Sequence, residues 1–266
     1  MKTKQLFRLI LSLLFAFSLS VGVLAAEEEA EKEPAVLRIA TVEDFLDFAE
    51  SCRLDSFSAE LSVKLESDID LTETDFSGIP WFAGHFDGGG HSITGLLIDC
   101  DGSAQGLFRY LTAEARVENL HVQGSVIPGG SRGKVGGLAG ENAGIIVNCS
   151  FQGTVSGGER VGGIAGKNCV TGIVENCRMK GELIGDHFIG GIAGENLGVI
   201  RSCFNGAAVN ITAQQNSVEL EDVKLETLAG TEAPNTVTDV GGIAGSSTGV
   251  IRDCENRGDV GYKHMG

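Results

Sequence analysis

A glycine-rich pentapeptide that recurs at a nearly constant interval constrains this chain more than any other feature. Gly-Gly-(Leu/Ile)-Ala-Gly begins at Gly136, Gly162, Gly190 and Gly241, at spacings of 26, 28 and 51 residues, the last close to two periods. A fixed period of about 20–50 residues indicates a repeat architecture, in which each unit buries its apolar face only against its neighbours. The chain is therefore expected to fold as a stack of similar units.

Two further elements follow each pentapeptide. One is Gly-(Ile/Val)-(Ile/Val)-x-(Asn/Ser/Asp)-Cys, whose copies end at Cys149, Cys177, Cys203 and Cys254. The other is Gly-x-(Val/Leu), whose copies end at Val155, Leu183 and Val260. A degenerate copy of the unit occupies residues 106–126. Each period therefore contains three short apolar stretches separated by glycine-rich corners.

These stretches predict strands, because they are too short for helices and are rich in Val and Ile. Three strands in a period of about 26 residues fit one coil of a parallel β-helix. We therefore predict an all-β fold, a right-handed parallel β-helix (solenoid) of about five to seven coils, over residues 57–261. The small residues of the pentapeptide at 136–140, and of its later copies, let the chain turn tightly.

Residues one period apart in such a stack lie above one another, about 4.8 Å apart. Three interior columns are predicted: Leu120, Cys149, Cys177, Cys203 and Cys254; Ile146, Val174, Ile200 and Ile251; and Val126, Val155, Leu183 and Val260. A polar column beside the thiols is predicted to hydrogen-bond from coil to coil: Asn119, Asn148, Asn176, Ser202 and Asp253. Outside, Glu175 is expected to face Arg201, an exposed pair worth under about 1 kcal/mol.

Both ends of the stack need protection, because a terminal coil exposes its interior and unpaired backbone. Residues 37–56 predict an N-terminal capping helix, in which Thr41 and Asp44 have capping-box spacing and apolar residues fall mainly on one face. No comparable cap follows Val260. Residues 262–266 are therefore predicted to be a truncated or uncapped end, with further coils downstream or end-to-end self-association.

An insertion interrupts the repeat over residues 210–238. Residues 217–225 alternate in part between polar and apolar side chains, which is compatible with a strand in a projecting loop. Long excursions of this kind either carry function or are disordered. Both interpretations stay open for this segment.

The N-terminus has the pattern of an export signal. Three basic residues precede an apolar run over 9–24, and two alanines close it, which predicts a cleaved signal peptide at 1–26. The run is shorter than the ~20 residues that span a bilayer, and three glutamates follow it directly, so a membrane anchor is disfavoured. Residues 27–36 are predicted to be an acidic, disordered leader.

The charge of the chain restricts its partners. Loss of the signal removes three of 20 basic residues and none of 36 acidic ones, which leaves a formal net charge of −19. This charge disfavours binding to nucleic acid or to anionic lipid, and no membrane insertion is expected after signal removal. One tryptophan and two tyrosines also argue against a thick globular core.

The repeats resemble the GLUG repeats of bacterial secreted and surface proteins. The resemblance rests on segments such as Val161-Gly-Gly-Ile-Ala-Gly166 followed by an Asn-Cys strand, and it covers about residues 37–261. The upstream segments 67–71 and 85–91 also look like the usual lead-in. Such repeats occur in adhesin-like surface proteins and beside the catalytic domain of immunoglobulin A1-cleaving metallopeptidases. The resemblance implies a stalk or binding region.

The seven cysteines do not predict a metal centre. Four of them share one column, where thiols act as small apolar groups, so we predict them to be free and buried. Disulfides stay chemically open, because an exported protein meets an oxidising compartment. A zinc site is disfavoured, because column thiols are strung along the axis and do not converge as a tetrahedron. Cys169 lies in a corner insertion and could be exposed.

Catalysis on a β-helix needs clustered carboxylates, often with calcium. The candidates are Asp68, Asp70, Asp87, Asp99 and Asp101. Asp68 and Asp70 belong to a strand and turn and Asp87 opens a glycine turn, where aspartate is common for local reasons. His85 and His91 could bind a metal, but no His-Glu-x-x-His motif accompanies them. The sequence thus predicts no catalytic, cofactor-binding or metal-ligating residue and no cofactor.

These observations favour a non-enzymatic, exported cell-surface module that acts as an adhesin-like binding region or a stalk. Its expected partner is an extracellular ligand, such as a host or matrix protein or a glycan. The alternative is a polysaccharide-processing β-helix enzyme, a lyase or glycosidase. The two differ in their lateral surface, because the enzyme requires several carboxylates and a basic residue in one groove.

Overall fold

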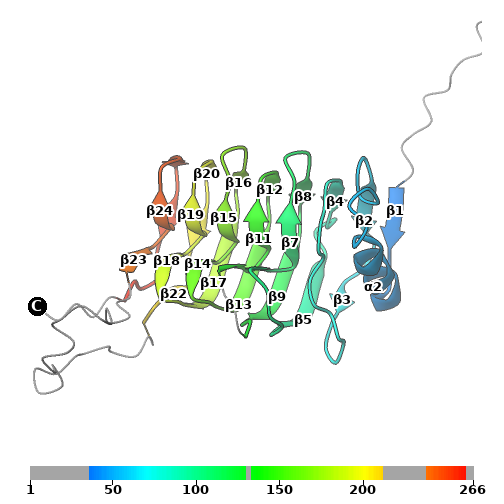
Figure 1. Cartoon of the computed structure of the whole chain (residues 1–266), viewed down its shortest axis with the longest axis horizontal. Helices are drawn as coiled ribbons and strands as arrows, with labels where there is room; N and C mark the ends of the chain where they lie inside the picture. The colour runs from blue at the N-terminus through cyan, green and yellow to red at the C-terminus, as the bar shows by residue number, and fades with distance from the viewer. Residues whose placement is uncertain (1–35, 130–132, 212–237, 262–266) are drawn as a thin grey trace, which may run out of the picture. The chain divides into compact units, whose positions relative to one another are not determined.

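The computed structural model describes residues 36–129, 133–211 and 238–261. They form an all-β parallel solenoid, as predicted, and its coils follow one another from β1 (Val36–Ile39) to β26 (Glu255–Asn256), as Figure 1 shows. The predicted signal peptide and all of the acidic leader but its last residue lie outside the described residues. Val36 itself begins β1.

Each regular coil has four strands, not the three predicted. In one coil they are β10 (Lys134–Gly136), β11 (Ala139–Asn142), β12 (Ile145–Val147) and β13 (Ser150–Ser156). The prediction was wrong because the pentapeptide is a corner between two strands and takes part in both. Its glycine and alanine have low β propensity. The main chain nevertheless pairs with the next coil, as when the Leu138 N–H donates to the Ile164 carbonyl at 3.0 Å.

Equivalent strands of neighbouring coils pair in parallel and build four sheets along the stack. Sheet A adds β2 (Ser62–Leu65), β4 (His85–Asp87), β8 (Arg116–Glu118), β16 (Ile173–Glu175), β20 (Val199–Arg201) and β25 (Val250–Arg252) to β1 and β12. Sheet B contains β3 (Ile69–Asp70), β5 (Ser92–Ile98), β9 (His121–Val126), β13, β17 (Arg178–Ile184), β21 (Phe204–Asn205) and β26, and β22 (Ala208–Val209) also pairs with β17. Sheet C contains β7 (Phe108–Leu111), β11, β15 (Ala165–Asn168), β19 (Ala193–Asn196) and β24 (Ala244–Ser247). Sheet D contains β6 (Ala104–Gln105), β10, β14 (Glu159–Gly162), β18 (His187–Gly190) and β23 (Thr238–Gly241).

The number of coils falls in the predicted range. Sheets C and D each have five strands, which mark five complete coils. Ahead of them lie partial coils that contain β2 with β3 and β4 with β5. The 51-residue interval between the last two pentapeptides is one coil step and not two, because Gly190 pairs directly with Gly241. The predicted strand at 217–225 lies outside the described residues.

The predicted interior columns are confirmed. Ile146, Val174 and Ile200 are in register and fully buried. Cys149, Cys177 and Cys203 are likewise at most 2% exposed. The prediction was wrong for the burial of Cys254, which is only half-buried because no further coil of the described structure covers it. One member was missed in the third column, since Val209 pairs with Leu183 on one side and with Val260 on the other.

The polar column forms the corner between sheets A and B. Asn119, Asn148, Asn176, Ser202 and Asp253 all have φ between 50° and 55°. This left-handed conformation costs asparagine and aspartate less than most residues. The predicted amide ladder is present: Asn176 donates to Asn148 at 2.7 Å, Asn148 donates to Asn119 at 3.3 Å, and Asn119 donates to Asp87 at 3.0 Å. The corner thus explains both the residue type and its repetition.

A second amide ladder, which the sequence analysis missed, lies in the core. Asn142 donates to Asn168 and Asn168 to Asn196, both at 2.8 Å, and Asn196 donates to Ser247 at 3.0 Å. The three asparagines are fully buried. The signal was in the sequence, because Asn follows Ala-Gly-x in three of the repeats.

The N-terminal coils have a wider, aromatic interior. Phe82, Phe86 and Phe108 pack with ring centroids 5.4–6.3 Å apart. From the next coil on, alanine replaces phenylalanine in the column of Phe108, starting with Ala139. The core therefore narrows as the repeat becomes regular.

The predicted capping helix is confirmed as α2 (Val42–Ser51). The Thr41 hydroxyl accepts from the Asp44 N–H at 3.1 Å, and the Asp44 carboxylate accepts from the Thr41 N–H at 3.0 Å. Phe48 packs on Phe82 and Phe86, 5.9 Å from each, so the helix covers the interior of the first coils. Strand β1, which precedes the helix and pairs with β2, was not predicted. No helix in the described part of the chain is long and apolar enough to cross a membrane.

The last described coil has a more open interior. Ile251 is 39% exposed and Val260 is 41% exposed, whereas their neighbours Ile200 and Val209 are fully buried. Beyond β23, β24, β25 and β26, the structure places no further strand in the described ranges 36–129, 133–211 and 238–261. This face therefore combines apolar side chains with strand edges.

Substitution of Cys177 should separate burial from thiol chemistry. Cys177→Asp places a carboxylate in a fully buried position and should cost several kcal/mol, whereas Cys177→Ala should cost about 1–2 kcal/mol. Thermal unfolding measures the difference. Equal melting temperatures for the two variants would contradict the interior column.

The buried amide ladder should contribute more to the free energy of unfolding than the exposed ladder does. Asn168→Ala leaves the Asn142 amide without its acceptor and the Asn196 oxygen without its donor, so the loss should be at least about 2 kcal/mol. The control Asn176→Gly keeps the left-handed backbone and removes one exposed bond, and should cost under about 1 kcal/mol. Chemical unfolding measures both variants. An equal loss of unfolding free energy in Asn176→Gly and Asn168→Ala would refute this order.

Candidate functional site

The structure places two of the candidate aspartates in turns that they stabilise. Asp70 accepts from the N–H of Thr72 at 3.0 Å and from its hydroxyl at 2.6 Å, and these bonds lower the pKa of Asp70. Burial opposes ionisation of Asp87, but hydrogen bonds from Asn119 and from the Gly89 N–H outweigh it and lower the pKa of Asp87. Both carboxylates are therefore charged groups that cap turns.

The remaining candidates do not join them. Asp68 accepts from the Ser92 N–H at 2.8 Å and lies 3.4 Å from His91 Nδ1. Asp99 and Asp101 are exposed in the segment after β5. In the described parts of the chain, no group of three or more His, Cys, Asp and Glu side chains is arranged to hold a metal ion.

The two histidines that could bind a metal are held in separate pairs. His85 Nε2 lies 2.8 Å from Glu118 Oε1, and the other oxygen of Glu118 accepts from Arg116 at 2.8 Å. His91 faces Asp68 instead. The pattern is that of surface pairs between adjacent turns and not of one convergent site.

The cysteines are all free in the structure. In the column, the thiol of Cys177 interacts with those of Cys149 and Cys203, and burial raises the pKa of Cys177 well above its usual value. Cys169 is half-buried, with its sulfur 3.3 Å from Glu141 Oε1. Burial, followed by the negative charge of Glu141, raises the pKa of Cys169 to about 11. The thiols of Cys169 and Cys177 are therefore protonated at neutral pH.

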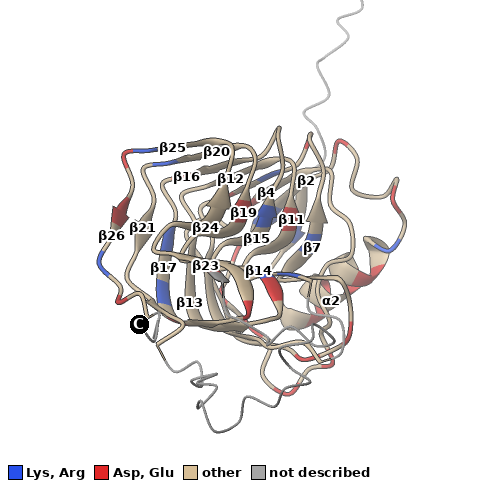
Figure 2. Cartoon of the chain, turned by 60° about the vertical axis from the view of Figure 1, so that its left-hand side comes forward, with Lys and Arg blue, Asp and Glu red and all other residues tan. Residues whose placement is uncertain are grey.

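Ion pairs cross between coils on the outer faces. The predicted pair is confirmed, since Arg201 donates to Glu175 at 2.5 Å on sheet A. On sheet C, Glu141, Lys167 and Glu195 occupy one register position in successive coils, an alternation of red and blue that Figure 2 shows on β11, β15 and β19. Lys134 and Arg160 of sheet D join this row through Glu141 and Glu195. Most basic side chains are thereby already neutralised.

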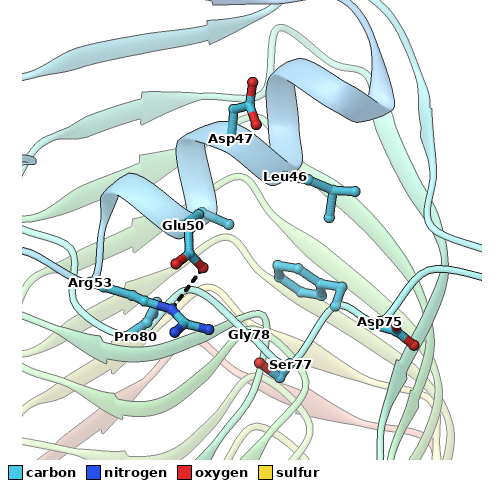
Figure 3. Close-up of a pocket in the computed structure, with 10 residues that line it drawn as sticks. Leu46, Asp47, Glu50, Arg53, Asp75, Ser77, Gly78 and Pro80 are labelled. Atoms are coloured by element: carbon cyan, nitrogen blue, oxygen red, sulfur yellow. Dashed lines mark ion pairs between the residues drawn. The ribbon is translucent and has the colours of Figure 1, made fainter.

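A small pocket lies between α2 and the segment 75–80 (Figure 3). Its volume is about 280 Å³, and the ion pair of Arg53 with Glu50, at 2.8 Å, lies on its wall. Asp47 and Asp75 also line it, together with Leu46. The lining contains three carboxylates and one guanidinium but no histidine or cysteine. This is the set of groups that the enzyme alternative requires, but all four charged side chains are exposed, and Glu50 is already paired with Arg53.

A wider hollow lies on the outer face of sheet B, and we call it the sheet B trough. Its volume is about 490 Å³, and it crosses β9, β13 and β17. Each strand contributes three consecutive residues in register: Gln123, Gly124 and Ser125; Gln152, Gly153 and Thr154; and Lys180, Gly181 and Glu182. The glycines form the floor, and amide, hydroxyl and charged side chains form two rims. This hollow was not predicted, because the Gly-x-(Val/Leu) element indicates a strand but not the shape of its outer face.

Two cations beside the trough lie in no ion pair among the described residues. They are Arg178 and Lys180, both exposed on β17, which carries two blue bands in Figure 2. The Arg178 guanidinium lies 5.9 Å from the ring centre of Phe204, and Arg257 stacks on the same ring at 5.8 Å. Arg257 is itself paired with Glu255 at 2.5 Å, so Arg178 and Lys180 are the two cations that place positive charge at this end of the trough.

Comparison with known families identifies the repeat. Residues 131–156 match the family described as the GLUG motif. This segment is a GLUG motif. It contains one pentapeptide and strands β10 to β13, so one motif builds one coil. The resemblance drawn from the sequence is thereby confirmed for the repeat.

The relatives share parts of the chain. A halomucin from Haloquadratum walsbyi is 32% identical over 132 residues, which is 46% of this chain and 1% of the halomucin. A protein from Evansella cellulosilytica, provisionally named a Gly-rich membrane protein, is 38% identical over 101 residues, 34% of this chain and 12% of that protein. The chain thus spans only a small part of these curated relatives.

One solved structure shares the fold. A crystal structure from Bacteroides ovatus, provisionally named an immunoglobulin A1 protease, superposes with a TM-score of 0.54 over 84% of this chain and 75% of that one, at 19% identity. At this identity the likeness supports the solenoid architecture alone.

Thiol labelling should follow these environments. At pH 8, iodoacetamide should modify native Cys169 at least about tenfold more slowly than free cysteine, because only the thiolate reacts and its pKa is about 11. The rate should rise with pH as the thiolate fraction increases. Cys149, Cys177 and Cys203 should react only after unfolding. Mass spectrometry checks each site, and a disulfide between column neighbours would contradict the assignment.

Proposed function

We propose that this chain is an exported cell-surface repeat module that acts as an adhesin-like binding region or stalk and catalyses no reaction. The observation that carries the proposal is the way the solenoid uses its polar groups. The buried amide ladder, the corner ladder and ion pairs such as that of Arg201 with Glu175 bond from coil to coil, which makes a stiff stack with long lateral faces. Such faces suit extended binding surfaces.

The placement of the carboxylates argues against the alternative of a polysaccharide-processing enzyme. A glycosidase uses two carboxyl groups on either side of the scissile bond. Asp70 and Asp87 are occupied in capping turns, and Asp68 bonds to the next strand. In the sheet B trough, the lining contains a single carboxylate, that of Glu182.

The comparisons support the location. One relative is named a halomucin and another a Gly-rich membrane protein, and both names fit a place at the cell surface. The GLUG motif and the export pattern of residues 1–26 agree with this location.

Export can be tested directly. The full chain and a variant without residues 1–26 should be expressed in a bacterial host and followed by cell fractionation. The full chain should leave the cytoplasm and lose the signal, whereas the shortened variant should stay inside, because the n-region and apolar run direct export. Equal distribution of the two forms would contradict an exported protein.

Binding without catalysis requires a second assay. The purified chain should be incubated with a panel of matrix proteins and polysaccharides, and both retention on the immobilised ligand and release of new reducing ends should be measured. Retention without product supports a binding module. Product that scales with protein concentration would favour the enzyme.

We also propose end-to-end self-association through the last described coil. Its exposed Ile251 and Val260 and its strand edges resemble an interface more than a finished surface. Light scattering on residues 27–266 should show a mass that rises with concentration. A monomer at every concentration would refute the association.

A further inference from the structure

We infer that the sheet B trough, together with Arg178 and Lys180, binds an acidic glycan chain that lies across successive coils. This inference rests on the proposed function, because it names a ligand class for one lateral face of the module.

The trough has a form that repeats with the coils. Gln123, Gln152 and Lys180 stand in one row, and Ser125, Thr154 and Glu182 stand in the other. Adjacent strands of a sheet are about 4.8 Å apart, so equivalent donors and acceptors recur at that interval along the floor. A polymer with regularly spaced polar groups can contact the same side-chain types in successive coils.

The two cations at the β17 end of the trough favour a negatively charged ligand. The chain is strongly acidic, yet the two exposed cations of β17 lie in no ion pair among the described residues, whereas Lys134, Lys167 and Arg160 are paired on sheets C and D. An exposed cation without a partner attracts a ligand anion at little desolvation cost.

A glycan fits the trough better than an acidic peptide does. Strands β9, β13 and β17 each pair on both sides, so a peptide cannot add to them as a further strand. The rims also present no apolar pocket for an anchoring side chain, since their residues are amide, hydroxyl or charged. Hydroxyl groups of a sugar can donate to and accept from the amides of Gln123 and Gln152 and the hydroxyls of Ser125 and Thr154. Its carboxylates can pair with Arg178 and Lys180.

The test uses the full chain and three probes in titration calorimetry: a hyaluronate oligosaccharide, a neutral dextran oligosaccharide of similar length, and polyglutamate of similar charge. Hyaluronate should bind, and its affinity should fall as NaCl rises, because exposed charges are screened. Dextran should bind at least about tenfold more weakly, because it has no group for the cations. Polyglutamate should be weaker than hyaluronate, because it lacks the hydroxyls.

Three variants locate the site. The double substitution of Arg178→Gln and Lys180→Gln should weaken hyaluronate binding at least about tenfold, and Gln152→Trp, which fills the trough without a change of charge, should do the same. Lys64→Gln is the matched control, because Lys64 is an exposed, unpaired lysine of sheet A among the described residues, and it should leave the affinity unchanged. Circular dichroism should confirm that each variant is folded.

The outcomes separate this inference from the proposed function. Hyaluronate binding that survives the double substitution and Gln152→Trp overturns the trough as its site and leaves the binding module intact. Stronger binding of polyglutamate than of hyaluronate, lost in the double variant, overturns the glycan in favour of an acidic peptide. Retention of none of the panel ligands in the earlier assay, with no hyaluronate binding, refutes this inference and the binding role, and leaves the stalk as the form of the proposed function that stands.

Discussion

The close, in-register approach of successive main chains is the constraint on which the rest of the solenoid depends. A methyl group at Gly153 would lie 1.8 Å from the Gly124 carbonyl oxygen, and one at Gly181 would lie 2.0 Å from that of Gly153. The pentapeptide corner is equally tight, because a methyl group at Gly136 would lie 2.1 Å from the Ala139 carbonyl oxygen. At these positions the main chains can approach closely enough to hydrogen-bond only because the side chain is absent. The glycines that identify the repeat are those that the spacing requires.

Once the coils are in register, identical side chains meet one another, and each column must contain a residue type that tolerates its own kind. Thiols and aliphatic groups do so by packing, and asparagines do so because each amide has both a donor and an acceptor. On sheet C, charged residues alternate in sign from Glu141 to Lys167 to Glu195. Like charges also stand in register on sheet A, where Asp87 pairs with Glu118 and Arg201 with Arg252.

The spacing of the repeats predicted the columns, and the capping box predicted α2, whereas other features were missed even where they repeat, such as the buried amide ladder. The thiol column and the pairing of Glu175 with Arg201 follow from the period, because the period fixes which residues lie above one another. The fourth strand was missed because glycine and alanine have low β propensity. Strand β1 was missed because it belongs to no repeat, and its partner β2 follows only after the helix. The trough depends on how far the side chains of three neighbouring strands project from sheet B, which the spacing of the repeats does not predict.

The corner after β22 shows how this architecture can acquire new parts. Residues 212–237 lie outside the described ranges, yet on either side of them Val209 pairs with Leu183 and Gly241 with Gly190. Register on both sides is set by the neighbouring coil and not by the length of the connection. The entropy of closing a loop grows only slowly with its length. Whole domains could therefore be grafted at this corner, and a lineage of such proteins could diversify there without redesign of its scaffold.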